Sequence, residues 1–160
     1  MGRLLLTTLT NPWRSLLRFD VGDLVQIDPS CACSCGSDDG YIGSGIAGRI
    51  ADLTYTTNGT PVTTATIESI MMEWESVAEY QVFQQDCIYD INIVLDEDTA
   101  ASKSLKEEII ERFLSIYGRS AFINVHFVEK IETGPSGKYR LTRSNIPVDV
   151  DRLFGKENGL

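Results

Sequence analysis

The sequence has few basic residues, a single histidine and no long apolar run. Its 14 Lys and Arg stand against 23 Asp and Glu, and the net charge of −9 argues against general nucleic-acid binding, which needs a basic surface. The histidine, His126, has no Ser or Cys partner in view, so we expect a half-exposed strand residue and no hydrolytic triad. No apolar run reaches the roughly 18–20 residues that span a membrane, and Leu4-Leu5-Leu6 is too short for a signal-peptide core. We therefore expect a cytoplasmic protein that binds neither membrane nor nucleic acid.

Cysteine is concentrated in one short segment, where Cys31, Cys33 and Cys35 lie close together, while Cys87 stands apart. Small secreted scaffolds spread their cysteines along the chain, so this pattern does not predict a disulfide framework. Thiolates bind zinc, but structural zinc sites usually separate paired cysteines by two to four residues. A zinc site at Cys31, Cys33 and Cys35 is one interpretation, and the spacing favours the other, which is surface thiols without a metal.

Residues 1–50 predict a β-hairpin with a long loop. Residues 3–10 are rich in Leu and Thr, and residues 15–27 form a second extended stretch that Gly22 interrupts. Residues 28–45 contain four Gly, three Cys and one Pro, which is typical of a loop. Because an isolated two-stranded hairpin is marginal in water, we expect this segment to be the end of a larger core domain.

Residues 51–145 predict a small mobile α+β domain in which an antiparallel sheet is backed by two helices, as in ferredoxin-like folds. Asn58-Gly59 predicts a hairpin with a type I′ turn, which needs positive φ at both central residues. Ser104 and Glu107 form a candidate capping box for the longer helix. We predict helices at 64–74 and 102–117, strands at 77–85, 88–95, 121–129 and near 139–141, and a partly disordered tail at 146–160.

Three short segments contain the residues that could take part in chemistry. The carboxylate of Asp23, at a Gly-Asp turn, offers two acceptor oxygens to adjacent hydroxyls such as those of a ribose, or else it caps the turn. Arg49 follows Gly48 at a strand end, where it could bind an anion or form a plain surface salt bridge. Lys138 ends a Gly/Ser/Pro-rich loop, where its ammonium group could stabilise a phosphate under attack or lie in an exposed turn.

The order and spacing of these segments resemble the C-terminal third of the adenylate-forming ligases. The closest resemblance is to the group of phenylacetate–CoA ligase, coenzyme F390 synthetase and CapK. The stretch Arg18-Phe19-Asp20-Val21-Gly22-Asp23-Leu24 is similar to their aromatic-x-x-Gly-Asp motif, and Gly48-Arg49-Ile50-Ala51-Asp52 is similar to the stretch that joins their two domains. The loop Gly134-Pro135-Ser136-Gly137-Lys138-Tyr139-Arg140 resembles the one that carries their mobile lysine.

The resemblance implies a reaction and its ligands. In these enzymes a carboxylic acid and ATP give an acyl-adenylate and pyrophosphate, and a nucleophile such as coenzyme A then displaces AMP. A small C-terminal domain rotates between the two half-reactions. The implied ligands are therefore ATP with Mg²⁺, a small carboxylic acid and coenzyme A. The implied residues are Asp23 and Arg49 for the ribose, Ala51 and Asp52 for the hinge, and Lys138 for stabilising the transition state.

The part of these ligases that grips the ATP phosphates is an upstream Ser/Thr/Gly-rich loop, and the sequence contains no such stretch. Because catalysis needs both reactants held in register, we predict that the chain alone has no ligase activity. Its expected partner is the missing N-terminal ligase portion. The alternative is a stand-alone interaction module without chemistry of its own, which would pair with a second copy through its spare hairpin to form a homodimer.

Overall fold

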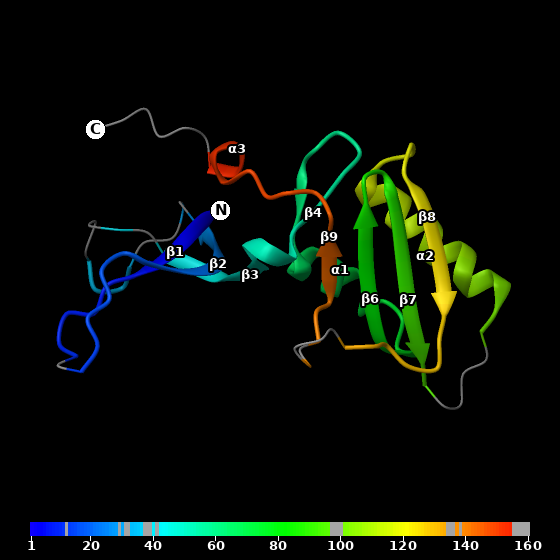
Figure 1. Cartoon of the computed structure of the whole chain (residues 1–160), viewed down its shortest axis with the longest axis horizontal. Coiled ribbons are helices and arrows are strands. Elements are labelled where there is room, and N and C mark those ends of the chain that lie inside the picture. Colours follow the sequence, from blue (N-terminus) through cyan, green and yellow to red (C-terminus); the bar gives the residue numbers. More distant parts are fainter. Residues whose placement is uncertain are drawn as a thin grey trace.

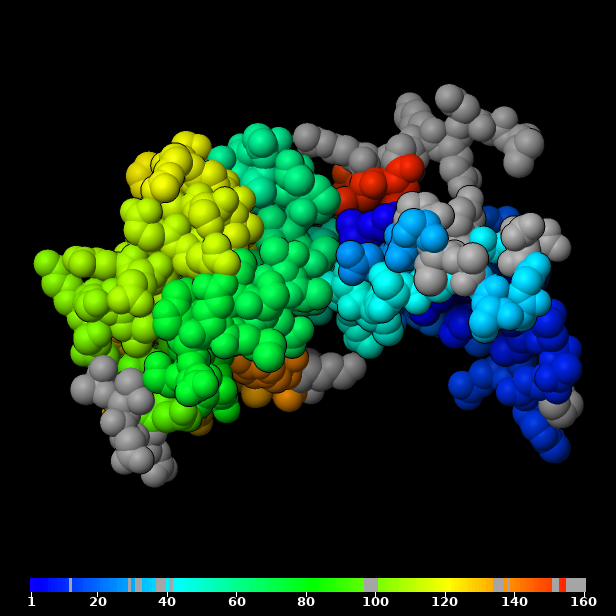
Figure 2. All heavy atoms as spheres, turned by 180° about the vertical axis from the view of Figure 1, so that it is seen from behind, coloured from blue at the N-terminus to red at the C-terminus, as the bar shows by residue number. Residues whose placement is uncertain are grey.

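A three-stranded sheet and a four-stranded sheet lie at opposite ends of the molecule in the computed structural model, with the second sheet backed by two helices (Figure 1). In Figure 2 the blue N-terminal residues and the green and yellow residues of the second sheet and its helices occupy opposite ends of the molecule. None of the helices in the described part of the chain is both long and apolar enough to cross a membrane. The structure describes residues 1–11, 13–28, 30, 33–36, 40, 42–96, 101–133, 137 and 139–154, and at 151–152 it describes the backbone alone.

The N-terminal sheet is antiparallel, with its strands in chain order: β1 (Gly2–Leu6), β2 (Phe19–Asp28) and β3 (Ile42–Arg49). The predicted loop at 28–45 is therefore wrong at its end, because a third strand begins at Ile42. Glycine hides this strand from sequence analysis, since Gly43 and Gly45 interrupt its apolar alternation. Gly43 also lets β3 approach β2 closely, because a Cβ there would lie 3.0 Å from Cγ1 of Val25.

The larger sheet has the order β8-β7-β6-β9 and is mixed rather than antiparallel. β6 and β7 pair antiparallel, but β8 is parallel to β7 and β9 is parallel to β6. The predicted antiparallel sheet is thus wrong for two of three pairings, and the ferredoxin-like arrangement is not confirmed. For β8 the physical reason is that α2 crosses over between β7 and β8, which returns the chain in the same direction. The elements are α1 (Thr64–Met71), β6 (Val77–Gln85), β7 (Ile88–Leu95), α2 (Lys103–Tyr117), β8 (Phe122–Phe127) and β9 (Thr142–Ser144).

Capping and turn residues differ in detail from the sequence prediction. The Ser102 side chain caps α2 by accepting from the Leu105 N–H at 3.1 Å, whereas the Ser104 hydroxyl hydrogen-bonds to Glu108 instead. The turn at Asn58-Gly59 is not of type I′, because positive φ occurs at Gly59 alone of these two residues. It still joins a short hairpin of β4 (Thr54–Tyr55) and β5 (Pro61–Val62).

Two apolar cores hold the fold. The larger core lies between the four-stranded sheet and its helices α1 and α2. The smaller one joins Leu24 of β2 and Ala47 of β3 to Leu53 and Tyr55, which follow a 3-10 helix, η1 (Ile50–Asp52). Ile146, Val148, Leu153 and Phe154 pack against it, the last two from α3 (Val150–Phe154). The first part of the predicted tail, residues 146–154, therefore helps to bind the N-terminal sheet to the rest of the chain.

Candidate functional site

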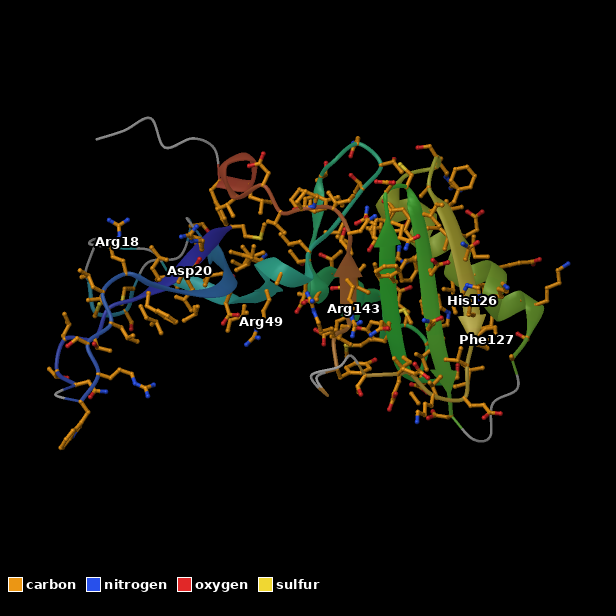
Figure 3. The ribbon with its side chains drawn as sticks, viewed as in Figure 1. Arg18, Asp20, Arg49, His126, Phe127 and Arg143 are labelled. Atoms are coloured by element: carbon orange, nitrogen blue, oxygen red, sulfur yellow. The ribbon has the colours of Figure 1, made fainter. Side chains whose placement is uncertain are left out.

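Asp23 and Arg49 lie opposite each other in the N-terminal sheet, where they are register partners on β2 and β3. The Arg49 Nε lies 3.4 Å from Asp23 Oδ1, and the Arg49 side chain is 67% exposed while that of Asp23 is 23% exposed. Figure 3 shows Arg49 between the two sheets. An exposed guanidinium beside a carboxylate offers both donors and acceptors to a hydroxylated or phosphorylated ligand. The structure thus brings the two residues together, and their ribose-binding role stays a prediction.

Gly48 fixes how the end of β3 meets α1. Its φ is +133°, and a Cβ at this position would lie 2.1 Å from Oγ1 of Thr64, the first residue of α1. The Thr64 hydroxyl also donates to the Ala47 carbonyl at 3.5 Å. A side chain at Gly48 would therefore separate the helix from the strand that carries Arg49.

The predicted hinge residues Ala51 and Asp52 lie in η1, where Arg140 and Thr142 hold them. Arg140 Nε donates to Asp52 Oδ1 at 2.7 Å, and its Nη2 donates to Asp52 and to the Ala51 carbonyl. The Thr142 hydroxyl donates to the Asp52 carbonyl. We call Asp52 and Arg140 the hinge clamp. The sequence pattern alone indicates no role for Arg140, although it stands two residues after Lys138.

Lys138 and residues 134–136 lie outside the described residues, so the position predicted for the mobile lysine stays a prediction. The residues that flank this loop are buried or hydrogen-bonded. Ile131 is buried before it, and after it the Tyr139 hydroxyl donates to the Tyr80 carbonyl of β6. The Gln81 amide donates to the Arg140 carbonyl at 2.8 Å. The segment after the loop is therefore attached to β6 of the C-terminal sheet.

The cysteine segment shows a close pair of thiols. Cys33 Sγ and Cys35 Sγ lie 2.6 Å apart, and both residues are exposed, while Cys31 lies outside the described residues. Within the described ranges no group of three His, Cys, Asp or Glu side chains could hold a metal ion. The zinc interpretation for Cys31, Cys33 and Cys35 stays a prediction. Cys87 is exposed in the turn between β6 and β7.

A buried polar network fixes the hairpin that follows the hinge. Gln84 is fully buried, and its Nε2 donates to the carbonyls of Tyr55 and Asp86 at 2.8 and 2.9 Å, while its Oε1 accepts from the Tyr55 N–H at 2.8 Å. The Tyr89 hydroxyl donates to the same Tyr55 carbonyl at 2.5 Å, and burial raises the pKa of Tyr89 to about 12. Above the network lies a groove of about 450 Å³ between this hairpin, the β6–β7 turn and the segment before α3.

Comparisons with known proteins find a matching family model and similar solved structures. A family model described as the CapK C-terminal domain matches residues 54–145. A similar solved structure is the open conformation of 2-hydroxyisobutyryl-CoA ligase in complex with 2-HIB-AMP and CoA, with 18% sequence identity and a TM-score of 0.51. The match covers 83% of this chain and 29% of that chain, so this chain spans less than a third of the ligase's length. Among curated proteins none matches the sequence.

Proposed function

Because the chain belongs to the CapK C-terminal domain family, we propose that it is the C-terminal part of an ATP-dependent adenylate-forming ligase. The complete enzyme would join a carboxylic acid to AMP and then transfer the acyl group to coenzyme A or another nucleophile. The chain alone is inactive in this proposal, since it lacks the upstream phosphate-gripping loop.

One observation carries the proposal: the candidate ribose pair, the hinge and the base of the lysine loop form a continuous series of contacts. Arg49, which pairs with Asp23, directly precedes η1. The last residue of η1, Asp52, is bound by Arg140, two residues beyond Lys138. Segments about 90 residues apart in the chain thus meet at the junction where a rotating domain would need its hinge.

In the proposed mechanism the side chains act on charge and position. The Asp23 carboxylate accepts hydrogen bonds from the ribose hydroxyls of ATP, and Arg49 donates to a ribose or phosphate oxygen. The Lys138 ammonium lies beside the phosphate oxygens, where negative charge accumulates as the substrate carboxylate attacks. No described residue is assigned to Mg²⁺, because these residues contain no group of three metal-ligating side chains.

The proposed partner is the upstream portion of the ligase, which would cover the loop between β1 and β2. Leu9, Trp13 and Leu17 in this loop are 89%, 93% and 82% exposed. The loop has its own hydrogen bonds, such as that from the Thr8 N–H to the Leu16 carbonyl at 2.9 Å. Exposed apolar groups on an ordered loop are typical of interaction surfaces, and tryptophan is a frequent anchor.

A second candidate is a homodimer that pairs through the edge of β1. Within the described residues β1 pairs with β2 alone, so its other edge is open to a further strand. Light scattering at micromolar concentration distinguishes the two partners. The ligase proposal expects a monomer that associates with the upstream portion and shifts the Trp13 emission to shorter wavelength, whereas a stable dimer of the chain alone supports the second candidate.

The catalytic proposal is tested by acid-dependent ATP–pyrophosphate exchange with the chain and the upstream portion together. We expect Asp23→Asn to raise the KM for ATP about tenfold, the loss of about one charged hydrogen bond. Asp20→Asn is the matched control, because Asp20 pairs with Arg3 at 3.3 Å in the same sheet. Equal effects of the two substitutions, or none from Asp23→Asn, would count against a ribose-binding role.

A further inference from the structure

The outer face of the four-stranded sheet carries a polar depression to which the mechanism above assigns no residue. The helices cover the other face of the sheet (Figure 1). Because side chains alternate along a strand, those that alternate with the buried Val82, Ile91 and Val125 point away from the helices. The depression has a volume of about 590 Å³, within the range of small-molecule sites. It is lined by Gln81, Phe83, Asp90, Asn92, His126, Val128 and Arg143.

Arg143 lines this depression with a positive charge that forms no ion pair among the described residues. Five arginines form ion pairs with carboxylates, but within the described part of the chain Arg143 forms none. Its Nε is shielded from solvent and has no hydrogen-bond partner among the described residues. In a chain with a net charge of −9, a half-buried arginine without a carboxylate partner is unusual and points to an anionic ligand.

The one carboxylate of the depression already has partners. Asp90 Oδ1 accepts from the Asn124 amide at 3.0 Å and lies 3.6 Å from Nε2 of His126. His126 is 52% exposed, which confirms the predicted half-exposed strand position. Figure 3 shows Arg143 toward the β9 side and His126 toward the β8 side of the sheet. Asp90 is thus engaged by residues of β8, while Arg143 has no ion-pair partner among the described residues.

We propose that this depression binds a phosphate-bearing small molecule, with its phosphate on Arg143. A guanidinium group recognises phosphate through paired hydrogen bonds, and Phe83, the register partner of Arg143, offers an apolar surface to the organic part. Asn92 and His126 are register partners on β7 and β8, and they can donate hydrogen bonds to the ligand's other polar groups. This site is distinct from the Asp23–Arg49 pair, which lies in the other sheet.

Free nucleotides and coenzyme A both carry this chemistry, so the test uses ADP, coenzyme A and inorganic phosphate as separate probes. Each is titrated into the chain by isothermal calorimetry at low ionic strength, and amide NMR shifts locate the site. We expect saturable binding of ADP or coenzyme A with shifts centred on Asn92 and His126, and weaker binding of inorganic phosphate. The tighter of the two organic probes identifies the source of the phosphate group.

Substitutions then separate a site from general attraction. Arg143→Met removes the charge with little change in shape, and we expect it to weaken binding at least tenfold, whereas Arg143→Lys keeps part of the affinity. Arg119→Met is the control, since Arg119 forms an exposed ion pair with Glu111 at 2.8 Å. The proposal is overturned if no probe binds at millimolar concentration, or if Arg143→Met and Arg119→Met have equal effects. Because the assay needs neither turnover nor an upstream portion, its failure leaves the ligase proposal untouched.

Discussion

The hinge clamp between Asp52 and Arg140 yields the sharpest prediction about how the two ends of the chain are connected. Asp52→Ala removes the acceptor of the 2.7 Å hydrogen bond from Arg140 Nε, and Arg140→Met removes its donors while keeping the aliphatic stem. Each substitution also leaves a partly buried charge without its partner. We expect each single change to lower the free energy of unfolding by about 2 kcal/mol.

The size of the coupling follows from exposure. A hydrogen bond to a charged group contributes about 1.5–3 kcal/mol, while exposed ion pairs contribute about 0–1 kcal/mol because solvent screens them. The side chains of Asp52 and Arg140 are 18% and 39% exposed, which places the clamp between these limits. The destabilisation of the double variant should therefore be smaller than the sum of the two single destabilisations by about 1–2 kcal/mol.

Urea unfolding of the wild type, the two single variants and the double variant measures this coupling. The pair Glu73 and Arg112 is a suitable comparison, because its two side chains are more exposed than those of the clamp, at 44% and 46%. We expect its coupling to be below about 1 kcal/mol. Hydrogen exchange at residues 51–53 should accelerate in the clamp variants only. Additive effects of Asp52→Ala and Arg140→Met, within about 0.3 kcal/mol, would refute the clamp as an energetic link.

Three further predictions concern stability. Gly48→Ala should lower the free energy of unfolding, measured in urea, by about 3 kcal/mol, because the φ of +133° and the 2.1 Å between a Cβ and Thr64 Oγ1 both oppose a side chain there. A loss below about 1 kcal/mol would contradict this reasoning. Gln84→Leu should lower the free energy of unfolding by about 3 kcal/mol in the same assay, since it leaves the Tyr55 N–H buried without its acceptor. An unchanged urea midpoint would argue against the buried polar network. The pKa of Tyr89 is about 12 in the folded state, above its ordinary value of 10. Its contribution to the free energy of unfolding is therefore complete below pH 10 and is lost as pH rises through 12. Unfolding at pH 9 to 12 should show this decline, and Tyr89→Phe should reduce its slope.

Local sequence signals predicted the central part of the fold well. The bounds of β6 and β7 agree with their alternating apolar residues, and α2 follows its apolar stripe from the Ser102 cap to Gly118. β3 was missed because Gly43 and Gly45 leave no alternation to detect. The parallel pairings of β8 and β9 were missed for another reason, since strand order depends on contacts between distant segments rather than on local pattern.

For the candidate site, too, local sequence signals indicated some residues, while others depend on contacts that the local sequence does not show. Asp23 and Arg49 were chosen from local motifs, and the structure brings them together across β2 and β3. Arg140 was missed because its partner Asp52 is 88 residues away in the chain, and nothing in the local sequence shows which arginine will meet which carboxylate. Arg143 was missed since its unusual feature is an absent partner, which becomes visible only when the neighbours of the side chain are known.

In the proposed function, Lys138 is the mobile lysine of an adenylate-forming ligase. The most direct measurement is acid-dependent ATP–pyrophosphate exchange by the chain with the upstream portion, comparing Lys138→Ala with Lys130→Ala as a control in the same loop region. We expect Lys138→Ala to lower the exchange rate by about 10²-fold or more, because this is the usual effect of removing one group that stabilises transition-state charge. We expect Lys130→Ala to change the rate less than about twofold. Exchange that proceeds equally well in both variants would contradict the claim.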